Sequence, residues 1–207
     1  MSTISDSGPT ADDALQRLKD GNARFVAGTA TFPTVQKEIL ANLVKGQRPY
    51  ATILSCSDSR VPTELIFDAG FGELFVIRVA GNVLSPEIAG SLQYAGRHLH
   101  TPLFVVLGHT HCGGIKGACD DLHMGNLTGA LAKIRPAVQT IAKDWKDGEM
   151  NSKNDKFVDA VMRENVKLVI KNIREQSEII HELEKKGKVM IVGAAYDVDT
   201  GKVSFFN

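Results

Sequence analysis

The sequence predicts an α/β fold, with a mainly parallel β-sheet flanked by helices. Short, continuous apolar runs indicate strands that are buried on both faces, and the segments between them have helical periodicity. The clearest of these runs is Leu103–Leu107 (LFVVL), which is bounded by Pro102 and Gly108. Parallel strands need helical connections, which cover both faces of the sheet. A chain of 207 residues builds one hydrophobic core, so we expect a single domain over residues 1–207.

An extended helical arm is expected at the N-terminus, over residues 1–33. Asp12 and Asp13 are acids that suit the start of a helix, and apolar residues recur after them at helical spacing as far as Gly28. A polar connector from Gly28 to Pro33 then joins this amphipathic helix to the rest of the chain. We expect the arm to embrace a second subunit.

The remaining elements follow from apolar periodicity and from the Gly and Pro residues between the apolar runs. We expect a helix over Val35–Val44, strands over Tyr50–Ser55 and Leu74–Val79, a helix over Ile88–Leu99, and strands over Leu103–Leu107, Val189–Ala194 and Val203–Phe206. The chain from Ala130 to Lys186 is expected to be helical apart from a polar loop over Lys146–Lys156. A turn at Asp199–Gly201 makes the last strand an antiparallel edge.

Charge and composition disfavour several classes of function. The 24 Lys and Arg residues balance the 24 Asp and Glu residues, so nothing indicates a nucleic acid as partner. No apolar run approaches the roughly 18 residues of a membrane span, so no membrane is expected either. Three cysteines do not form a disulfide framework and suit a reducing compartment. We expect the cytoplasm, with the periplasm as the alternative if a signal peptide has been removed.

Two of the expected strands end in residues that bind metals. The first is followed by CSDSR at 56–60, and the third by GHTHC at 108–112. Ligand sites of parallel sheets lie at the carboxyl ends of the strands. Thiolate, imidazole and carboxylate are zinc ligands, and two thiolates select Zn²⁺ over harder divalent ions. His109 and Cys112 are three residues apart on a strand-to-helix turn and can reach one metal, whereas His111 points elsewhere in most conformations.

A single cysteine is weak evidence for a metal site, because free Cys is among the residue types most often buried. Taken alone, Cys56 or Cys112 is more simply interpreted as a small core residue. Both together, at strand ends and with His and Asp in the same motifs, favour a metal. Cys119 stands alone in a helical stretch and is interpreted as packing. The chain has no phosphate-binding loop motif, and the spacing from Cys56 to Arg60 is too short for a phosphatase loop.

Four motifs together resemble those of the β-class carbonic anhydrases. They are CSDSRVP at 56–62, ELFVIR at 73–78, AGN at 80–82 and GHTHCGG at 108–114. The similarity extends from about Asp13 to the closing VGAAYDVDTGKV. The resemblance implies a zinc enzyme that interconverts carbon dioxide and bicarbonate. It also implies a homodimer or tetramer with active sites at the dimer interface.

The resemblance further implies the residues of the site. The zinc ligands would be Cys56, His109 and Cys112. Asp58 matches a carboxylate that either takes the fourth zinc position or pairs with the arginine matched by Arg60, which leaves room for water. The substrate pocket and a backbone donor to the reacting oxygen are implied at Gln47, Phe75, Ala80, Tyr94 and Gly113.

This ligand set predicts a mechanism. A zinc-bound water with a pKa near ~7 is a hydroxide nucleophile at neutral pH, which the hydration of carbon dioxide requires. Two thiolates cancel the charge of the metal, so Asp58, held by Arg60, is expected to accept a proton or a hydrogen bond from that water. We expect an open site with three protein ligands at neutral pH. His111 is a candidate proton shuttle, the alternative being a histidine that is hydrogen-bonded within its turn.

Two other functions fit the same motifs. Hydrolysis of an isoelectronic substrate such as carbon disulfide uses the same ligands on this fold, and the motifs do not separate the two reactions. A closed structural zinc module would take all four ligands from the protein. Arg60, ready to remove Asp58 from the metal, favours the enzyme over the module.

Overall fold

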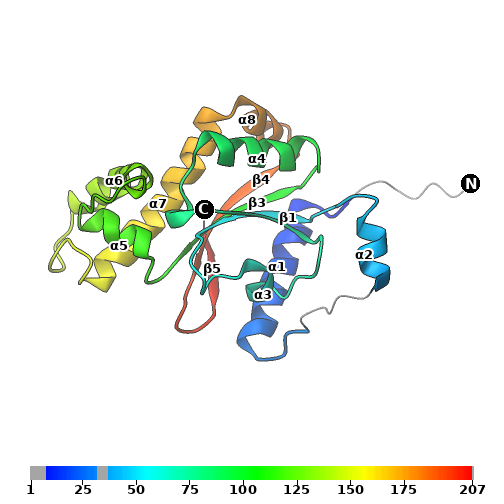
Figure 1. The fold of residues 1–207 in the computed structure, drawn as a ribbon, viewed down its shortest axis with the longest axis horizontal. Helices are drawn as coiled ribbons and strands as arrows, with labels where there is room; N and C mark the ends of the chain where they lie inside the picture. The colour runs from blue at the N-terminus through cyan, green and yellow to red at the C-terminus, as the bar shows by residue number, and fades with distance from the viewer. Residues whose placement is uncertain (1–7, 32–36, 207) are drawn as a thin grey trace, which may run out of the picture.

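A single five-stranded sheet forms the centre of the protein (Figure 1). The structure is a computed structural model, which describes residues 8–31 and 37–206. The strands lie in the order β2-β1-β3-β4-β5. Their bounds are β1 Ala51–Ser55, β2 Leu74–Arg78, β3 Leu103–His109, β4 Met190–Tyr196 and β5 Val203–Phe206. The first four are parallel and β5 is antiparallel to β4, so the predicted fold class is confirmed.

The longer helices lie where apolar periodicity predicted helices, and the structure also contains short helical elements that the periodicity did not predict. They are α1 Ala11–Val26, α2 Lys37–Leu43, α3 Thr63–Ile66, α4 Pro86–Arg97, α5 Gly113–Cys119, α6 Leu127–Ala142, α7 Asp155–Gln176 and α8 Glu178–Lys185, with a 3₁₀ turn, η1, at Ala80–Asn82. The helix α3 and the turn η1 are too short to have an apolar period. Val35, at the start of the second predicted helix, lies outside the described residues.

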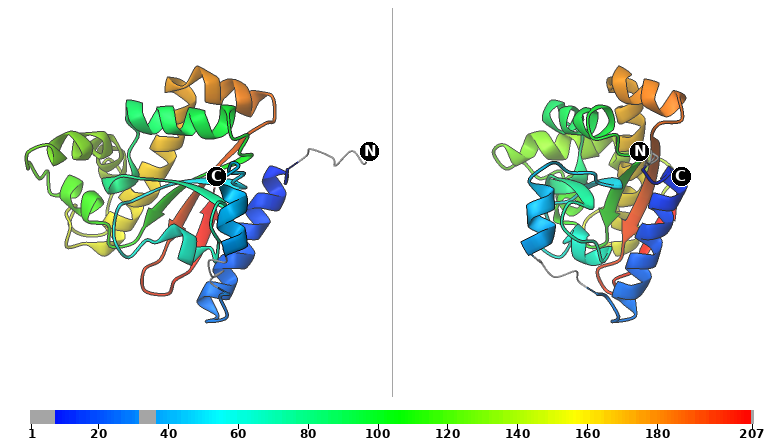
Figure 2. Two further views of the ribbon diagram at one scale, coloured as in Figure 1. Left: turned by 45° about the vertical axis from the view of Figure 1, so that its right-hand side comes forward. Right: turned by 90° about the vertical axis from the view of Figure 1, so that its right-hand side faces the viewer.

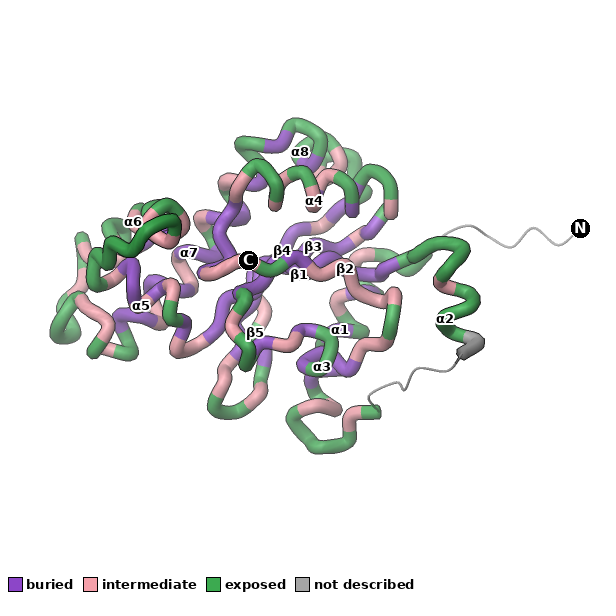
Figure 3. The backbone as a smooth tube through the Cα atoms, in the orientation of Figure 1, coloured by how far each residue is buried: buried purple, intermediate pink, exposed green. Residues whose placement is uncertain are grey.

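Helices cover both faces of the sheet (Figures 1 and 2). Successive side chains of a strand point to opposite faces, so Leu54 and Ile53 belong to different cores. Leu54 packs with residues of α4 to α8, and Ile53 packs with residues of α1 and α3. Figure 3 shows the resulting buried band along the strands. Within the part of the chain that the structure describes, no helix has the length and apolar character needed to cross a membrane.

The N-terminal helix α1 packs on its own chain. Thr10 caps it, accepting a hydrogen bond from the backbone N–H of Asp13, and Leu18 is fully buried. The Asn22 side chain donates to the Gly201 carbonyl at 2.9 Å and accepts from the Val203 N–H at 2.8 Å. These bonds tie α1 to the last strand. The embrace of a second subunit by the arm stays a prediction, and residues 1–7, 32 and 33 of the arm lie outside the described residues.

Candidate metal centre

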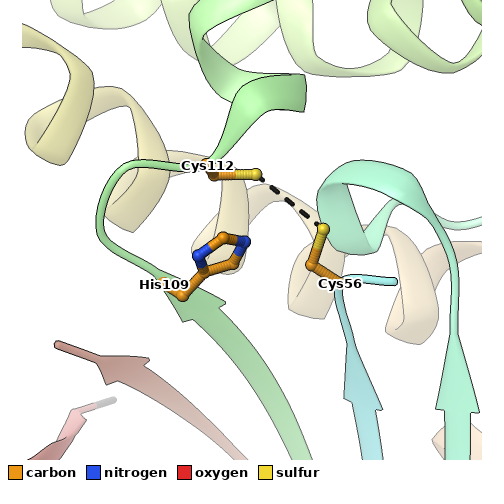
Figure 4. A group of neighbouring side chains, drawn as sticks. All are labelled: Cys56, His109 and Cys112. Atoms are coloured by element: carbon orange, nitrogen blue, oxygen red, sulfur yellow. Dashed lines mark hydrogen bonds between the residues drawn. The ribbon is translucent and has the colours of Figure 1, made fainter. Parts of the chain in front are cut away.

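Three potential ligands meet where two neighbouring strands end (Figure 4). Cys56 directly follows β1, His109 is the last residue of β3, and Cys112 is the N-cap of α5. In the parallel register Ser55 pairs with Leu107, so the two strand ends lie side by side. The side-chain ligand atoms of Cys56, His109 and Cys112 all lie within 4.8 Å of one another, and all three residues are buried. The group that the motifs predicted is therefore assembled.

The geometry of this group fits a tetrahedral zinc ion. The sulfur atoms of Cys56 and Cys112 are 3.9 Å apart. Two sulfurs bound to one tetrahedral zinc at about 2.3 Å each would lie about 3.8 Å apart. The His109 Nδ1 lies 2.8 Å from the Thr110 carbonyl oxygen, which can only accept, so Nδ1 carries the proton. The buried Nε2 atom has no hydrogen-bond partner among the described residues, and its lone pair is available to a metal.

The two thiols differ in acidity because they are hydrogen-bonded to each other. The bond from the Cys112 thiol holds the pKa of Cys56 well below its usual value. The same bond, together with burial, raises the pKa of Cys112. The Cys56 thiol is therefore the more acidic of the two. Both thiols would lose their protons on binding a dication here, because a coordinating thiol is deprotonated.

Asp58 and Arg60 form a two-pronged ion pair beside the ligands. The Arg60 Nε donates to Asp58 Oδ1 at 2.9 Å, and a terminal nitrogen of Arg60 donates to Oδ2 at 2.8 Å. These hydrogen bonds hold the pKa of Asp58 below its usual range, so the carboxylate is ionised at neutral pH. Oδ2 also lies 4.0 Å from the Nε2 of His109. The carboxylate therefore faces the place where the ligands converge, while both of its oxygens are engaged by Arg60.

Backbone contacts that the motifs did not predict hold the Cys56–Asp58 segment in place. The Arg78 guanidinium donates to the Cys56 carbonyl at 3.0 Å and to the Asp58 carbonyl at 2.6 Å. The N–H of Gly81 in η1 donates to the sulfur of Cys56 at 3.4 Å. The position of Arg78 at the end of β2, next to the end of β1, is the signal that could have identified it.

The His111 side chain is turned away from the ligands. Its Nε2 lies 2.9 Å from a carboxylate oxygen of Asp199, in the turn between β4 and β5. Its backbone carbonyl accepts a hydrogen bond from Arg60 at 3.2 Å. The imidazole thus bonds to a second turn, 88 residues away in the sequence, rather than within its own turn, and the role of proton shuttle stays a prediction.

The predicted pocket residues are not all near the ligands in one chain. Ala80 precedes Gly81 in η1, and Gly113 is the first residue of α5, so both adjoin the metal centre. Phe75 pairs with Thr52 near the opposite end of the strands, and the Tyr94 ring lies 6.1 Å from the Phe75 ring.

Gln47 is also remote from the ligands within one chain. It precedes β1, whereas Cys56 follows β1, and it lines a surface hollow with Pro49 and His98. A five-residue strand spans about 17 Å. Gln47, Phe75 and Tyr94 therefore do not reach the Cys–His–Cys group of their own chain.

Comparison with known proteins places the chain in a family. The sequence model of the carbonic anhydrase family matches residues 51–203. Carbonic anhydrase 2 of Mycobacterium tuberculosis is 38% identical over 191 residues, which is 91% of this chain and 89% of the relative.

Solved structures of the β class have the same fold. A β-carbonic anhydrase of Aspergillus fumigatus is 26% identical, with a TM-score of 0.74 over 95% of this chain and 90% of that one. A tetrameric β-carbonic anhydrase of Sordaria macrospora is 25% identical, with a TM-score of 0.74 over 91% of this chain and 94% of that one. The chain belongs to the β-carbonic anhydrase family and, as a member of it, is a carbonate dehydratase.

Proposed function

We propose that this carbonate dehydratase interconverts carbon dioxide and bicarbonate at a zinc ion held by Cys56, His109 and Cys112, with Asp58 and Arg60 as its acid–base pair. The observation that carries the proposal is the convergence of two thiols and an unpartnered imidazole nitrogen beside an ionised carboxylate. When bound there, zinc supplies a Lewis acid that activates water at neutral pH.

Asp58 has the chemistry of the proton-accepting group. Hydration adds water to the carbon of carbon dioxide and yields bicarbonate and one proton. A carboxylate that Arg60 keeps ionised can accept a hydrogen bond from the attacking water and so direct its lone pair at carbon. The 4.0 Å distance from Asp58 Oδ2 to His109 Nε2 supports this role, because it places the carboxylate beside the ligand atoms.

Arg60 and the glycine-rich turn after β3 can stabilise the negative charge of the bicarbonate product. Negative charge moves onto the substrate oxygens as bicarbonate forms, and a fixed guanidinium offsets it. The N–H of Gly113, in the first turn of α5, has no helical carbonyl to bond and is a further donor. Arg60 is held in place before substrate arrives, by Asp58 and by the His111 carbonyl.

An open site is favoured over a closed structural one. A closed zinc module needs a fourth protein ligand, and Asp58 is the carboxylate in position to provide it. Both Asp58 oxygens instead accept hydrogen bonds from Arg60. Moving Asp58 onto the zinc would break this charge-assisted ion pair. We therefore propose three protein ligands and one position for water at neutral pH.

A second copy of the chain would complete the substrate pocket. Since Gln47, Phe75 and Tyr94 lie far from the ligands of their own chain, we propose that a partner supplies them in a homodimer or a larger assembly. The edge strand β2 and the apolar surface beside it support this arrangement, with Phe71 57% exposed and Val44 87% exposed. Apolar patches at a sheet edge favour protein association.

Zinc analysis of two cysteine variants tests the proposed ligands. Cys112→Ser removes a ligand thiol, whereas Cys119→Ser removes a partly buried thiol outside the group. We expect about one zinc per chain in the wild type and in Cys119→Ser, and far less in Cys112→Ser. Carbon dioxide hydration should follow the zinc content, disappear with a chelator and return when zinc is added.

Three results would contradict the proposal. Zinc retained at full stoichiometry by Cys112→Ser would exclude the proposed ligand set. Zinc bound by the wild type without any hydration of carbon dioxide would favour a closed module. A zinc-loaded protein that turns over carbon disulfide but not carbon dioxide would have carbon disulfide as its substrate instead.

A further inference from the structure

The buried face of α7 contains one polar residue, Asn165, whose side chain contacts the backbone beside the metal centre. Asn165 is fully buried, and its neighbours on this face, Val161 and Val169, are apolar. Its Nδ2 donates to the Gly81 carbonyl at 3.1 Å. This bond joins residues 84 positions apart in the sequence, so no local motif could indicate it.

Gly81 is the residue whose N–H donates to the sulfur of Cys56. Its backbone has φ 71°, a left-handed conformation that suits glycine, and a Cβ there would lie 2.7 Å from a methyl carbon of Ile134. A Cβ on Gly114 would lie 3.2 Å from the Gly81 nitrogen. Gly81 is therefore closely packed against α5 and α6, and the hydrogen bond from Asn165 of α7 holds its carbonyl in place.

The Asn165 side chain is poorly explained by stability. Its Oδ1 atom is buried and has no hydrogen-bond partner among the described residues. An unpaired buried amide oxygen loses hydration without compensation, and a leucine of similar size would avoid that cost. The one hydrogen bond that the side chain donates goes to the backbone that contacts Cys56.

We propose that Asn165 is a positioning residue of the zinc site, which holds Gly81 so that its N–H donates to the Cys56 thiolate. A hydrogen bond to a ligating sulfur withdraws charge from it and fixes its direction. This bond would leave a bound zinc ion with more of its Lewis acidity despite two thiolate ligands, and would make Cys56 harder to displace. This inference rests on the proposed function in one respect, namely that Cys56 ligates zinc.

Zinc release and a spectroscopic signature test the role of Asn165. Asn165→Leu and Asn165→Ala remove the donor, and Val169→Ala is the control, because it truncates a buried residue of the same helix face that has no hydrogen-bonding side chain. Transfer of zinc to a chromogenic chelator should be roughly 10- to 100-fold faster in both Asn165 variants than in the wild type or the control. The thiolate-to-metal charge-transfer band of the Co²⁺-loaded protein should shift in these variants and stay in place in Val169→Ala.

The outcomes separate this inference from the proposed function. A wild type that binds no zinc would overturn the proposed function, and this inference with it. A wild type that holds zinc, with Asn165 variants that release it at the same rate and show an unshifted Co²⁺ band, would overturn the positioning role alone. So would equal acceleration in Val169→Ala, which would assign the effect to lost packing. If Asn165→Leu does not fold, the smaller Asn165→Ala decides.

Discussion

Polar atoms with and without partners determine the chemistry of the site at the scale of single residues. His109 donates from Nδ1 to a backbone carbonyl, and its Nε2 has no partner in the part of the chain that the structure describes, while Asp58 has both oxygens bonded to Arg60. The grouping of Cys56, His109 and Cys112 was predictable, because each lies in a short motif at a strand end. Arg78 could have been identified from its position at the end of β2, whereas Asn165 could not, since its bond to Gly81 joins segments 84 residues apart.

Replacing Arg60 with lysine tests the two-pronged pair. Lysine keeps the charge but cannot donate two parallel hydrogen bonds to Asp58, so kcat should fall by about tenfold or more. Arg60 lowers the pKa of Asp58, and a weaker pair lets that pKa rise. The carboxylate works when ionised, so the variant should lose activity at a higher pH than the wild type as pH falls.

Arg174→Lys is the matched control for this substitution. Arg174 makes the same two-pronged contact with Glu184, between α7 and α8. We expect this control to retain the wild-type rate and pH profile. An Arg60→Lys variant that behaves like Arg174→Lys would show that the ion pair has no part in catalysis.

Local patterns account for most of the secondary structure at the scale of elements. Apolar runs bounded by Gly and Pro predicted all five strands within two residues, although β3 continues to His109. The predicted arm helix is present as α1, but its attachment to the last strand through Asn22 was not predictable, because the bond from Val203 spans 181 residues. Sequence periodicity reports which face of a helix is apolar, not which surface that face covers.

Two glycine-to-alanine variants test the docking of α1. An alanine Cβ at Gly21 would lie 1.9 Å from the Phe67 carbonyl oxygen, whereas at Gly90 in α4 it would meet no atom within 4 Å. Gly21→Ala should lower the free energy of unfolding by about 2 kcal/mol, because α1 must shift. Gly90→Ala should raise it by ~0.5–1 kcal/mol through better helix propensity.

Urea unfolding at one protein concentration measures both effects. The comparison is matched, since each substitution adds one methyl group inside a helix. If Gly21→Ala were as stable as Gly90→Ala, α1 would not lie against Phe67 in the folded protein.

At the scale of the whole molecule, the edge of the sheet formed by β2 has the features of a subunit interface. The order β2-β1-β3-β4-β5 leaves β2 at an edge, next to exposed apolar residues of α2 and of the segment before β2. Gln47, Phe75 and Tyr94 lie on this side of the molecule, away from the ligands. The family resemblance predicted these residues as part of the site, but a single chain does not bring them to it, so we propose that assembly does.

Subunit complementation tests whether Gln47 acts in a neighbouring subunit. Gln47→Ala and Asp58→Asn should each be impaired alone. If Gln47 of one copy serves the zinc of another, a heterodimer has one intact site, and an equal mixture should recover about a quarter of the wild-type sites. Hydration rates before and after subunit exchange measure this recovery.

Two outcomes would contradict a contribution from the partner. A Gln47→Ala protein with the wild-type rate would remove Gln47 from the site. A mixture no more active than its components, with exchange confirmed by mass, would place both residues in the site of one chain.

Stopped-flow measurement of carbon dioxide hydration as a function of pH tests most directly whether Asp58 acts in catalysis at the zinc site. The zinc-loaded proteins to compare are the wild type, Asp58→Asn and Glu184→Gln. Glu184 is the control, because it accepts a two-pronged contact from an arginine outside the site. We predict that Asp58→Asn retains zinc but loses about 100-fold or more in kcat, whereas Glu184→Gln matches the wild type. Zinc-loaded Asp58→Asn with the wild-type rate at every pH would contradict the proposed mechanism.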